Sequence, residues 1–502
     1  MFWTRPRLTP TRRPWIASRP LGFERLDDRV TPALGLASAF AVGDSGEWAR
    51  DVVADAAGNT YVTGIYNRTV DFDRSDADLA TNPNLVLTSS TFTNSSGGTS
   101  NYSEAFVAKY DPTGACLWAV PVGRGGGNSG ERLALDVGPS HRGVVVTGYF
   151  NGTQSFGSYS VTSTGSDAYV ARLDDTTGAI QWVRRWGAYG SDSGYGVAVD
   201  TAGNVYATGM TTAGNSNDNQ DVYVVKYDVI GTEVWSKQFG GLSRDVGRCI
   251  TLDRAGNVLI GGDFLGTADF NPDSTVTYSL TSGGRSVSPS TAGFVVKLTQ
   301  ATGAFVWASH LQAANMYAGS AVVSLGTDAN NNVYAIGNFS GTVDFNPSKK
   351  AAHNVTGSTD GFAVRLDPQG NFAWQRTFGG DSNFDVYGAT VDGFGNIYVT
   401  GSFRGTVDLD PGTGTFSRTA VSGEEDVFVM KLSSTGSFVW GASMGGAGLD
   451  RGQGIAVDGL GNVYVVGLFR GVSNFNPDAA GAPYYLDGNP GYAMFYVKLT
   501  QS

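Results

Sequence analysis

The sequence repeats one unit seven times over its 502 residues. Each unit centres on the pattern Asp-x-x-Gly-Asn-x-Tyr-Val-x-Gly, then has a segment with an aromatic and a basic residue, and in six units ends with a tryptophan. Repeated units of this kind stack into one body, so they override the several domains that length alone suggests. The regular turns are Asp55–Asn59, Asp200–Asn204, Asp253–Asn257, Asp392–Asn396 and Asp458–Asn462. Asp328–Asn332 has Asn in place of Gly, and Asp136–Gly143 is a degenerate copy.

Four strands are predicted in each unit. In the third unit they are Gly196–Asp200, Val205–Gly209, Asp221–Asp228 and Glu233–Phe239. The turn glycine supplies the left-handed residue that a short hairpin requires. Because the strands are apolar at nearly every position, both faces of each sheet should be covered. The sequence therefore predicts an all-β fold, a seven-bladed β-propeller of four-stranded antiparallel blades.

The two ends of the repeat predict how the propeller closes. The last unit ends with its third strand, Tyr492–Leu499, and has no tryptophan strand. Leu34–Gly43, which precedes the first turn, has the features of an isolated fourth strand. We predict that this N-terminal strand completes the last blade and removes an exposed sheet edge.

Residues 34–502 resemble SBBP-type β-propeller repeats. The resemblance is carried by the Asp-x-x-Gly-Asn-x-Tyr-Val-x-Gly turns and by Phe-x-Gly-Thr-Val-Asp-Phe-Asn-Pro segments at Phe264–Pro272, Phe339–Pro347 and Phe403–Pro411. It implies the propeller fold, but the family is a scaffold of mostly unassigned role, and a fold does not settle function.

The first 33 residues differ from the rest: they are basic and carry no repeat. The stretch from Phe23 to Ala33, Phe-Glu-Arg-Leu-Asp-Asp-Arg-Val-Thr-Pro-Ala, resembles the planctomycetal extracellular N-terminal motif. That resemblance implies export to the cell surface or the medium, with residues 1–33 as a targeting segment that is removed or disordered. The alternative is a disordered basic tail. No apolar run reaches the length of a transmembrane helix.

The charge of the chain limits its partners. Its formal net charge is −11, which argues against binding the phosphate backbone of nucleic acid. A protein or polysaccharide ligand remains open, and we expect a monomer. The cysteines, Cys116 and Cys249, fall on different repeats, so neither a disulfide nor a metal pattern is predicted.

Acidic residues recur just before the innermost strand of the units. One interpretation is a ring at the mouth of the central channel that binds a cation or a basic ligand. The other is a bond to backbone amides that joins neighbouring blades. Repetition favours the second, because a functional site needs different residues from different blades. The residues are Glu47, Asp192, Asp245, Asp385 and Asp450, with Asn128 in the second unit.

Two loops place oxygen ligands on alternate residues, a spacing that calcium accepts. The first holds Asp71, Asp73, Asp76 and Asp78, and the second holds Asp269, Asn271 and Asp273. The EF-hand pattern with its central glycine and terminal glutamate is absent. Turns that end a strand have the same composition, so calcium and turn formation both stay open. No other cofactor is recognised.

The tryptophans and the basic residues have a structural interpretation. The segment Asp174-x-x-Thr177-Gly178-x-x-x-Trp182 resembles the tryptophan-docking motif of pyrroloquinoline quinone propellers. In that family the motif locks neighbouring blades, and we expect the same here. The basic residue of each third strand should pack its stem and extend its charge to a strand end or an acidic neighbour.

No catalytic set is recognised, and no Gly-x-Ser-x-Gly elbow is present. The sequence favours an exported extracellular or cell-surface binding scaffold. One alternative is an extracellular polysaccharide hydrolase or lyase that uses carboxylates at the channel mouth. A second is a calcium-stabilised surface protein.

Overall fold

The computed structural model describes residues 34–43, 46–73, 82–187, 190–212, 219–285, 288–346, 352–380, 383–478 and 481–501. The described residues all belong to one compact unit, Pro32–Ser502. The predicted targeting segment, residues 1–33, lies outside them. Among the described residues, none forms a helix long and apolar enough to cross a lipid bilayer.

The described chain is built from four-stranded antiparallel units, as the repeat predicts. The first unit contains β2 (Trp48–Ala54), β3 (Thr60–Tyr66), β8 (Glu104–Tyr110) and β9 (Cys116–Val122). The second contains β10 (Asn128–Asp136), β11 (Gly143–Phe156), β12 (Tyr159–Asp174) and β13 (Ile180–Trp186). The third contains β14 (Ser193–Val199), β15 (Val205–Thr212), β16 (Gln220–Tyr227) and β17 (Glu233–Gly241).

The later units keep the same order. The fourth contains β18 (Asp245–Leu252), β19 (Val258–Leu265), β24 (Thr291–Leu298) and β25 (Phe305–Ala313). The fifth contains β26 (Gly319–Thr327), β27 (Val333–Asp344), β28 (Asn354–Leu366) and β29 (Phe372–Phe378). The sixth contains β30 (Phe384–Val391), β31 (Ile397–Phe403), β34 (Asp426–Leu432) and β35 (Phe438–Gly446).

The last unit takes strands from both ends of the described chain. It contains β36 (Arg451–Val457), β37 (Val463–Asn474), β38 (Tyr485–Gln501) and β1 (Leu34–Val42). The ladder between β1 and β38 runs from Leu34 opposite Gln501 to Val42 opposite Met494. The expected pairing of the N-terminal strand with the last unit is therefore present. Unlike the fourth strands of the other units, β1 contains no tryptophan.

Short hairpins and turns decorate the outer parts of the units. The short strands are β4 (Thr69–Asp71), β5 (Val86–Thr88), β6 (Thr91–Thr93), β7 (Thr99–Asn101), β20 (Thr267–Asp269), β21 (Ser279–Thr281), β22 (Gly284–Arg285), β23 (Ser288–Pro289), β32 (Thr406–Asp408) and β33 (Ser417–Thr419). The 3-10 turns are Pro83–Leu85 and Val421–Gly423.

The repeated turn owes its sequence to a local hydrogen-bond set. In the first copy, Asp55 Oδ1 accepts from the backbone amides of Ala57 and Asn59 at 2.9 Å, and Oδ2 accepts from the Asn59 side chain at 2.8 Å. Gly58 has a φ of +84°, which glycine adopts without strain. Asn331, which replaces this glycine in the fifth unit, has a φ of +62°. The turn survives there because Asn tolerates the left-handed conformation.

In several units a tryptophan and a lysine join the unit to the next one. Trp118 Nε1 and Lys109 Nζ both donate to the carbonyl of Asp175, at 3.2 and 2.8 Å. The same pair recurs as Trp235 and Lys226, which both donate to the carbonyl of Gln300 at 3.1 and 3.3 Å. These contacts have the structural role expected of the tryptophan, and the lysine of each pair reaches the same carbonyl of the next unit.

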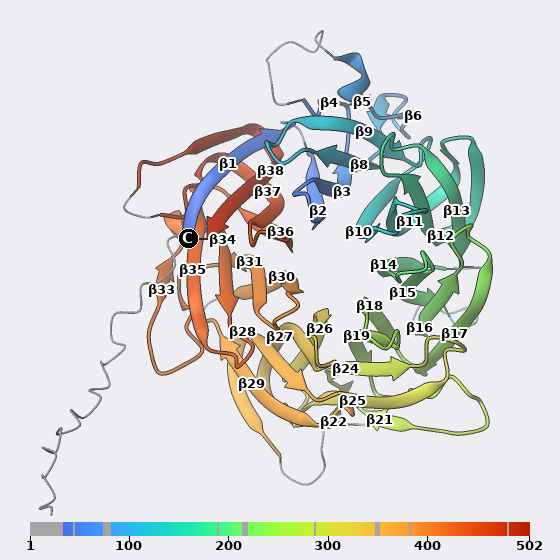
Figure 1. Ribbon diagram of the computed structural model, residues 1–502, viewed down its shortest axis with the longest axis vertical. Coiled ribbons are helices and arrows are strands. Elements are labelled where there is room, and N and C mark those ends of the chain that lie inside the picture. Colours follow the sequence, from blue (N-terminus) through green and yellow to red (C-terminus); the bar gives the residue numbers. More distant parts are fainter. Residues whose placement is uncertain are drawn as a thin grey trace, which may run out of the picture. The chain divides into compact units, whose positions relative to one another are not determined.

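Apolar side chains fill the space between the sheets. The cluster around Tyr61, Val146 and Tyr169, for example, takes buried residues from the first two units. The inner strands β2, β10, β14, β18, β26, β30 and β36 lie around the middle of this arrangement (Figure 1). A site that takes residues from every unit can therefore form where these strands meet.

Candidate functional site

Each inner strand carries a β-bulge at the same place, five residues before the turn aspartate. The register of the ladder to the second strand skips one residue there in all of the described units. A bulge leaves its extra residue unpaired and re-aims the side chain. The bulge residues are Arg50, Glu131, Tyr195, Arg248, Val323, Tyr387 and Gln453.

These bulge side chains converge on one cavity of about 370 Å³, here called the mouth cavity. All of them line it, together with Arg132, Ala321, Asn338 and Val386. The repeat therefore brings residues from distant parts of the chain to one place. The bulge positions hold five residue types, Arg, Glu, Tyr, Val and Gln, which is the asymmetry that a ligand site requires.

Arg132 connects two units across the mouth cavity. It starts from β10 in the second unit, and its Nη2 donates to the carbonyl of Tyr387 on β30 in the sixth unit at 3.3 Å. Its Nη1 donates to the carbonyl of Glu131 at 2.9 Å. The guanidinium thus crosses the central opening between strands of units that are not neighbours in the chain. It also lines a second cavity below.

The other charged groups of the mouth differ in their partners. Arg248 forms an ion pair with the buried carboxylate of Asp263. Arg50 lies with its guanidinium carbon 5.2 Å from the centroid of the Trp48 ring, and its buried Nε has no hydrogen-bond partner among the described residues. Glu131 accepts a hydrogen bond from the hydroxyl of Ser129 at 2.6 Å.

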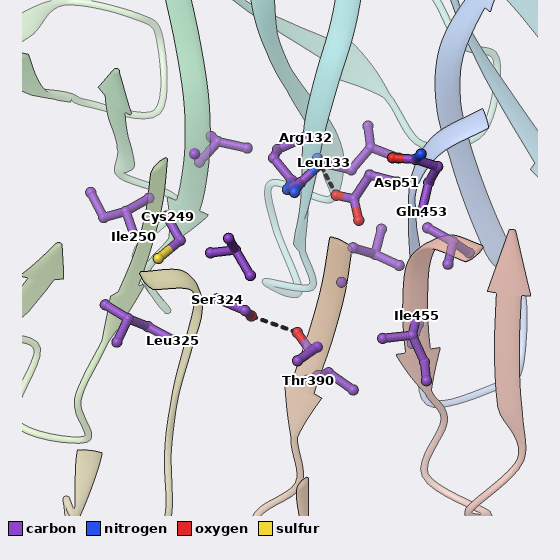
Figure 2. A pocket seen from close by; sticks show the side chains of 18 of the residues that line it. Asp51, Arg132, Leu133, Cys249, Ile250, Ser324, Leu325, Thr390, Gln453 and Ile455 are labelled. Carbon is purple, nitrogen blue, oxygen red and sulfur yellow. Dashed lines mark hydrogen bonds between the residues drawn. The ribbon is translucent and has the colours of Figure 1, made fainter. Parts of the chain in front are cut away.

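The second cavity, here called the inner cavity, has a volume of about 270 Å³ (Figure 2). Its wall includes one aliphatic residue from each inner strand, three positions before the turn aspartate. These residues are Val52, Leu133, Val197, Ile250, Leu325, Ala389 and Ile455. This aliphatic ring packs around the axis, and polar side chains of the same strands, among them Asp51, Ser324 and Thr390, line the rest of the cavity.

Three functional groups face the inner cavity (Figure 2). Asp51 accepts a hydrogen bond from the backbone amide of Leu133 at 2.8 Å, and burial raises the pKa of its carboxyl. The hydroxyl of Ser324 donates to the carbonyl of Ala389 at 2.6 Å. Burial raises the pKa of the Cys249 thiol to about 12, so the thiol is protonated and unreactive at neutral pH. These polar contacts join neighbouring inner strands.

The acidic residues predicted before the inner strands lie inside the sheets. Glu47, Asp192, Asp245 and Asp450 are at most 1% exposed, and none of them lines either cavity. Asp245 shows the shared role: its carboxylate accepts from the amide of Gly241 at 2.6 Å and from that of Leu265 at 3.2 Å. It thereby connects the outer strand of one unit to the second strand of the next.

Asp385 is not a member of this set, so the prediction for this residue is wrong by one position along the strand. Asp245 stands opposite Phe264 in its ladder, and the residue that stands opposite the equivalent Phe403 is Phe384. Asp385 pairs with Ser402 and so occupies the next position along the strand. Because successive side chains of a strand point to opposite faces, a shift of one residue changes the face.

The predicted calcium ligands act as turn acceptors where the structure describes them. Asp269 Oδ1 accepts from the amides of Asn271 and Tyr278 at 3.0 and 2.8 Å. Asn271 and Asp273 continue the series, the latter accepting from the amide of Thr275 at 3.0 Å. In the first loop, Asp71 accepts from the amide of Asp73 at 2.9 Å.

Part of the calcium prediction cannot be placed. Asp76 and Asp78 lie outside the described residues. Within the described part of the chain, no three His, Cys, Asp or Glu side chains gather as a metal site would need. Calcium binding stays a prediction for these loops.

Sequence reasoning missed the mouth residues because it followed what the units share. The position five residues before the turn aspartate holds Arg, Glu, Tyr, Arg, Val, Tyr and Gln in turn, between positions that are mostly glycine, small or aliphatic. This contrast was the available signal. A position that varies inside a regular repeat escapes the packing constraint and is free to contact a ligand.

The fold and this convergence of inner strands define a β-propeller repeat protein. Three segments, residues 181–215, 234–263 and 442–468, match the SBBP family, described as "Beta-propeller repeat". The match confirms the repeat type expected from the sequence.

Other similar proteins cover the chain unevenly. The chain is 26% identical to the "Uncharacterized WD repeat-containing protein L264" of Acanthamoeba polyphaga mimivirus over 155 residues. This stretch covers 30% of this chain and 11% of that relative. Among solved structures, a quinohemoprotein alcohol dehydrogenase from Comamonas testosteroni is 13% identical, with a TM-score of 0.37, over 92% of this chain and 76% of that one. The polysaccharide lyase Uly1 is 11% identical, with a TM-score of 0.38, over 93% of this chain and 99% of that one.

Proposed function

We propose that this protein is an exported β-propeller that binds a ligand in the mouth cavity, at the cell surface or outside the cell. The observation that carries the proposal is the mouth cavity itself. Its wall combines the bulge residues of the inner strands, and their side chains differ in charge, size and aromaticity. Packing alone gives no reason for such variety at one position of an otherwise regular repeat.

The proposal includes a closed ring of seven blades. Support comes from the inner strands, which together line both cavities, and from the ladder between β1 and β38. Contacts between the last and the first unit add to it: Lys498 Nζ donates to the carbonyl of Pro112 at 2.9 Å, and the hydroxyls of Tyr496 and Thr60 lie 3.0 Å apart. Lys498 thereby repeats the contact that Lys109 makes between the first two units.

Export rests on the sequence motif between Phe23 and Ala33. The measurement is where the full-length protein accumulates in its own cells and whether its mature N-terminus lies after Ala33. Accumulation of the uncleaved chain inside the cell would contradict export and would leave ligand binding at the mouth cavity to be judged separately.

We propose binding rather than cleavage of a polysaccharide. Hydrolysis of a glycosidic bond commonly uses two carboxyl groups on either side of the bond. Among the described residues that line the mouth cavity, Glu131 is the one carboxylate. Glu131 also accepts a hydrogen bond from the hydroxyl of Ser129, and this bond holds the carboxylate in place.

The test is an unbiased array of glycans and proteins probed with the full-length protein and two variants. Val323→Trp fills the mouth cavity, whereas Leu460→Trp places the same side chain on an exposed turn, where Leu460 is 82% exposed. We expect a ligand that binds the wild type and Leu460→Trp and is lost with Val323→Trp. A ligand that Val323→Trp retains would place the binding surface elsewhere and overturn the proposal.

A further inference from the structure

The mouth cavity has the opposite charge to the protein as a whole. Arg50, Arg132 and Arg248 line it, and Glu131 is its one acidic residue among the described residues. The whole chain has a formal net charge of −11. A cationic cavity inside an acidic protein concentrates the local field on an anion that enters it, while the surrounding surface repels polyanions that do not fit.

Two of the three arginines have hydrogen-bond donors that can bind a ligand. Arg248 is committed to Asp263. Within the described part of the chain, Arg50 and Arg132 form no ion pair with a carboxylate within 4.0 Å. Arg132 uses two nitrogens on backbone carbonyls, and the buried Nε of Arg50 has no partner. A buried guanidinium donor without a partner is costly unless something binds it, and a carboxylate fits its planar fork.

The uncharged residues of the mouth suit a sugar ring. Tyr195 and Tyr387, both partly buried, line the cavity from the third and sixth units. Aromatic faces pack against the C–H face of a pyranose, while amide side chains bond its hydroxyls. Gln453 lines the cavity, and its amide has no hydrogen bond to the residues that the structure describes.

We propose that the mouth cavity binds a carboxylate-bearing sugar residue, a uronate, of an acidic polysaccharide; this inference rests on the proposed function. Arg50 and Arg132 contact the carboxylate, and the two tyrosines and Gln453 contact the sugar. An acidic peptide offers the same charge but lacks the flat ring and the hydroxyl groups, so it is the weaker candidate.

Arg132 and the size of the cavity limit how the polymer sits. The Arg132 side chain reaches from β10 to the Tyr387 carbonyl on β30, 3.3 Å away, and so obstructs the passage of a polysaccharide along the axis. The mouth cavity, at about 370 Å³, is at the small end of the usual range for ligand sites. It therefore takes a terminal or side-branch residue rather than the interior of a chain.

The test measures affinity by calorimetry with the full-length protein. The probes are a tetramer of galacturonic acid, the same tetramer with its carboxyls methyl-esterified, and hexaglutamate. We expect the acid tetramer to bind, the ester to bind at least roughly tenfold more weakly, and the acid affinity to fall as salt rises. Hexaglutamate should not bind measurably.

Two variants should move the affinity in opposite directions. Arg50→Gln removes a charged donor and should weaken the acid tetramer roughly tenfold or more. Glu131→Gln removes a repelling charge and should strengthen it about threefold. Arg254→Gln, on an exposed turn outside the cavity, is the matched control and should have no effect. Circular dichroism and melting temperature show that each variant is folded.

Three outcomes would overturn this inference: equal binding of the acid and the ester, no effect of Arg50→Gln, or tighter binding of hexaglutamate. Its failure is distinguishable from that of the proposed function. If the array yields a neutral ligand that Val323→Trp abolishes, the mouth is a site but not for a uronate. If the array ligand is insensitive to Val323→Trp, the proposed function fails as well.

Discussion

A buried pair of carboxyl groups between the sixth and seventh units should make the protein less stable as pH rises. Asp450 is 0% and Asp426 3% exposed. Asp450 accepts from the amide of Gly446 at 2.8 Å and from the hydroxyl of Ser473 at 2.9 Å. One oxygen of Asp426 has no hydrogen-bond partner among the described residues. Burial raises the pKa of each carboxyl to about 7, and the charge of Asp426 adds to the effect on Asp450.

The perturbation is Asp450→Asn, which replaces a carboxyl by a neutral amide of the same shape. The amide oxygen can still accept from Gly446, and its nitrogen can donate to the unpartnered oxygen of Asp426. The second unit already has an asparagine at the equivalent position, although its hydrogen-bond partners differ. There Asn128 occupies the equivalent position, its oxygen accepts from the amide of Ala105, and its nitrogen donates to the carbonyl of Gly123 at 3.2 Å.

The sign follows from where the proton is bound. The folded protein keeps a proton on Asp450 up to about pH 7, whereas the unfolded chain releases it above its ordinary pKa of 3.8. The contribution of this group to the free energy of unfolding therefore falls between about pH 4 and pH 7 and is lost above that range. A pKa raised from 3.8 to about 7 corresponds to about 4 kcal/mol, an upper limit because the two carboxyls share the effect.

The assay is urea unfolding followed by tryptophan fluorescence at pH 4.5, 6 and 8. Asp450→Asn should match the wild type at pH 4.5 and exceed its free energy of unfolding at pH 8, by up to about 4 kcal/mol. The difference between the two proteins isolates this group from the other titrating residues. Asp273→Asn, at an exposed turn, is the control and should show no such gain. A pH-independent difference, or a variant less stable at pH 8, would refute the reasoning.

Three further predictions test the architecture by thermal or chemical unfolding. Phe40→Ala removes a ring of β1 that is 5% exposed and should lower the free energy of unfolding by about 3–5 kcal/mol. Ala37→Ser, on the exposed side of the same strand, should lower it little. Equal effects of the two changes would contradict the role of β1 in the last unit. Trp307→Phe loses the hydrogen bond from Nε1 to the carbonyl of Pro368 at 3.2 Å. In Trp374, Nε1 has no partner among the described residues. Trp307→Phe should therefore lower the free energy of unfolding by about 1 kcal/mol more than Trp374→Phe. Asp269→Ala leaves two amides without an acceptor and should cost about 1–3 kcal/mol, while Asp269→Asn keeps the acceptor and should resemble the wild type. Asp269 would be a calcium ligand rather than a turn acceptor if a chelator lowers the melting temperature of the wild type but not that of Asp269→Asn.

Much of the fold could be predicted because the constraints are local. The turn aspartate, its glycine and its asparagine form hydrogen bonds within five residues, as in Asp55–Asn59. The tryptophans and the basic residues are expected to be structural because they recur in every unit or nearly so, and the contacts of Trp118 and Lys109 with Asp175 agree with this. Repetition marks a residue that solves the same packing problem in each unit.

The candidate site could not be predicted in the same way. Asp385 shows why: an acidic residue one position out of register looks equivalent in the sequence, although it stands opposite Ser402 rather than Phe403. The bulge adds one residue to each inner strand and changes which side chains face the axis. The alternation of apolar and polar residues does not reveal the bulge. Arg50 and Glu131 therefore look like ordinary strand residues in the sequence.

The sequence by itself determined the strands, the turns and the residues that lock one unit to the next, because each depends on neighbours within one repeat or on a rule that every repeat obeys. Only the tertiary structure decided that Arg50, Arg132, Tyr195, Tyr387 and Gln453 meet in one cavity. These residues lie far apart in the chain, and they converge because the inner strands face a common axis and a bulge in each strand aims one side chain toward its mouth.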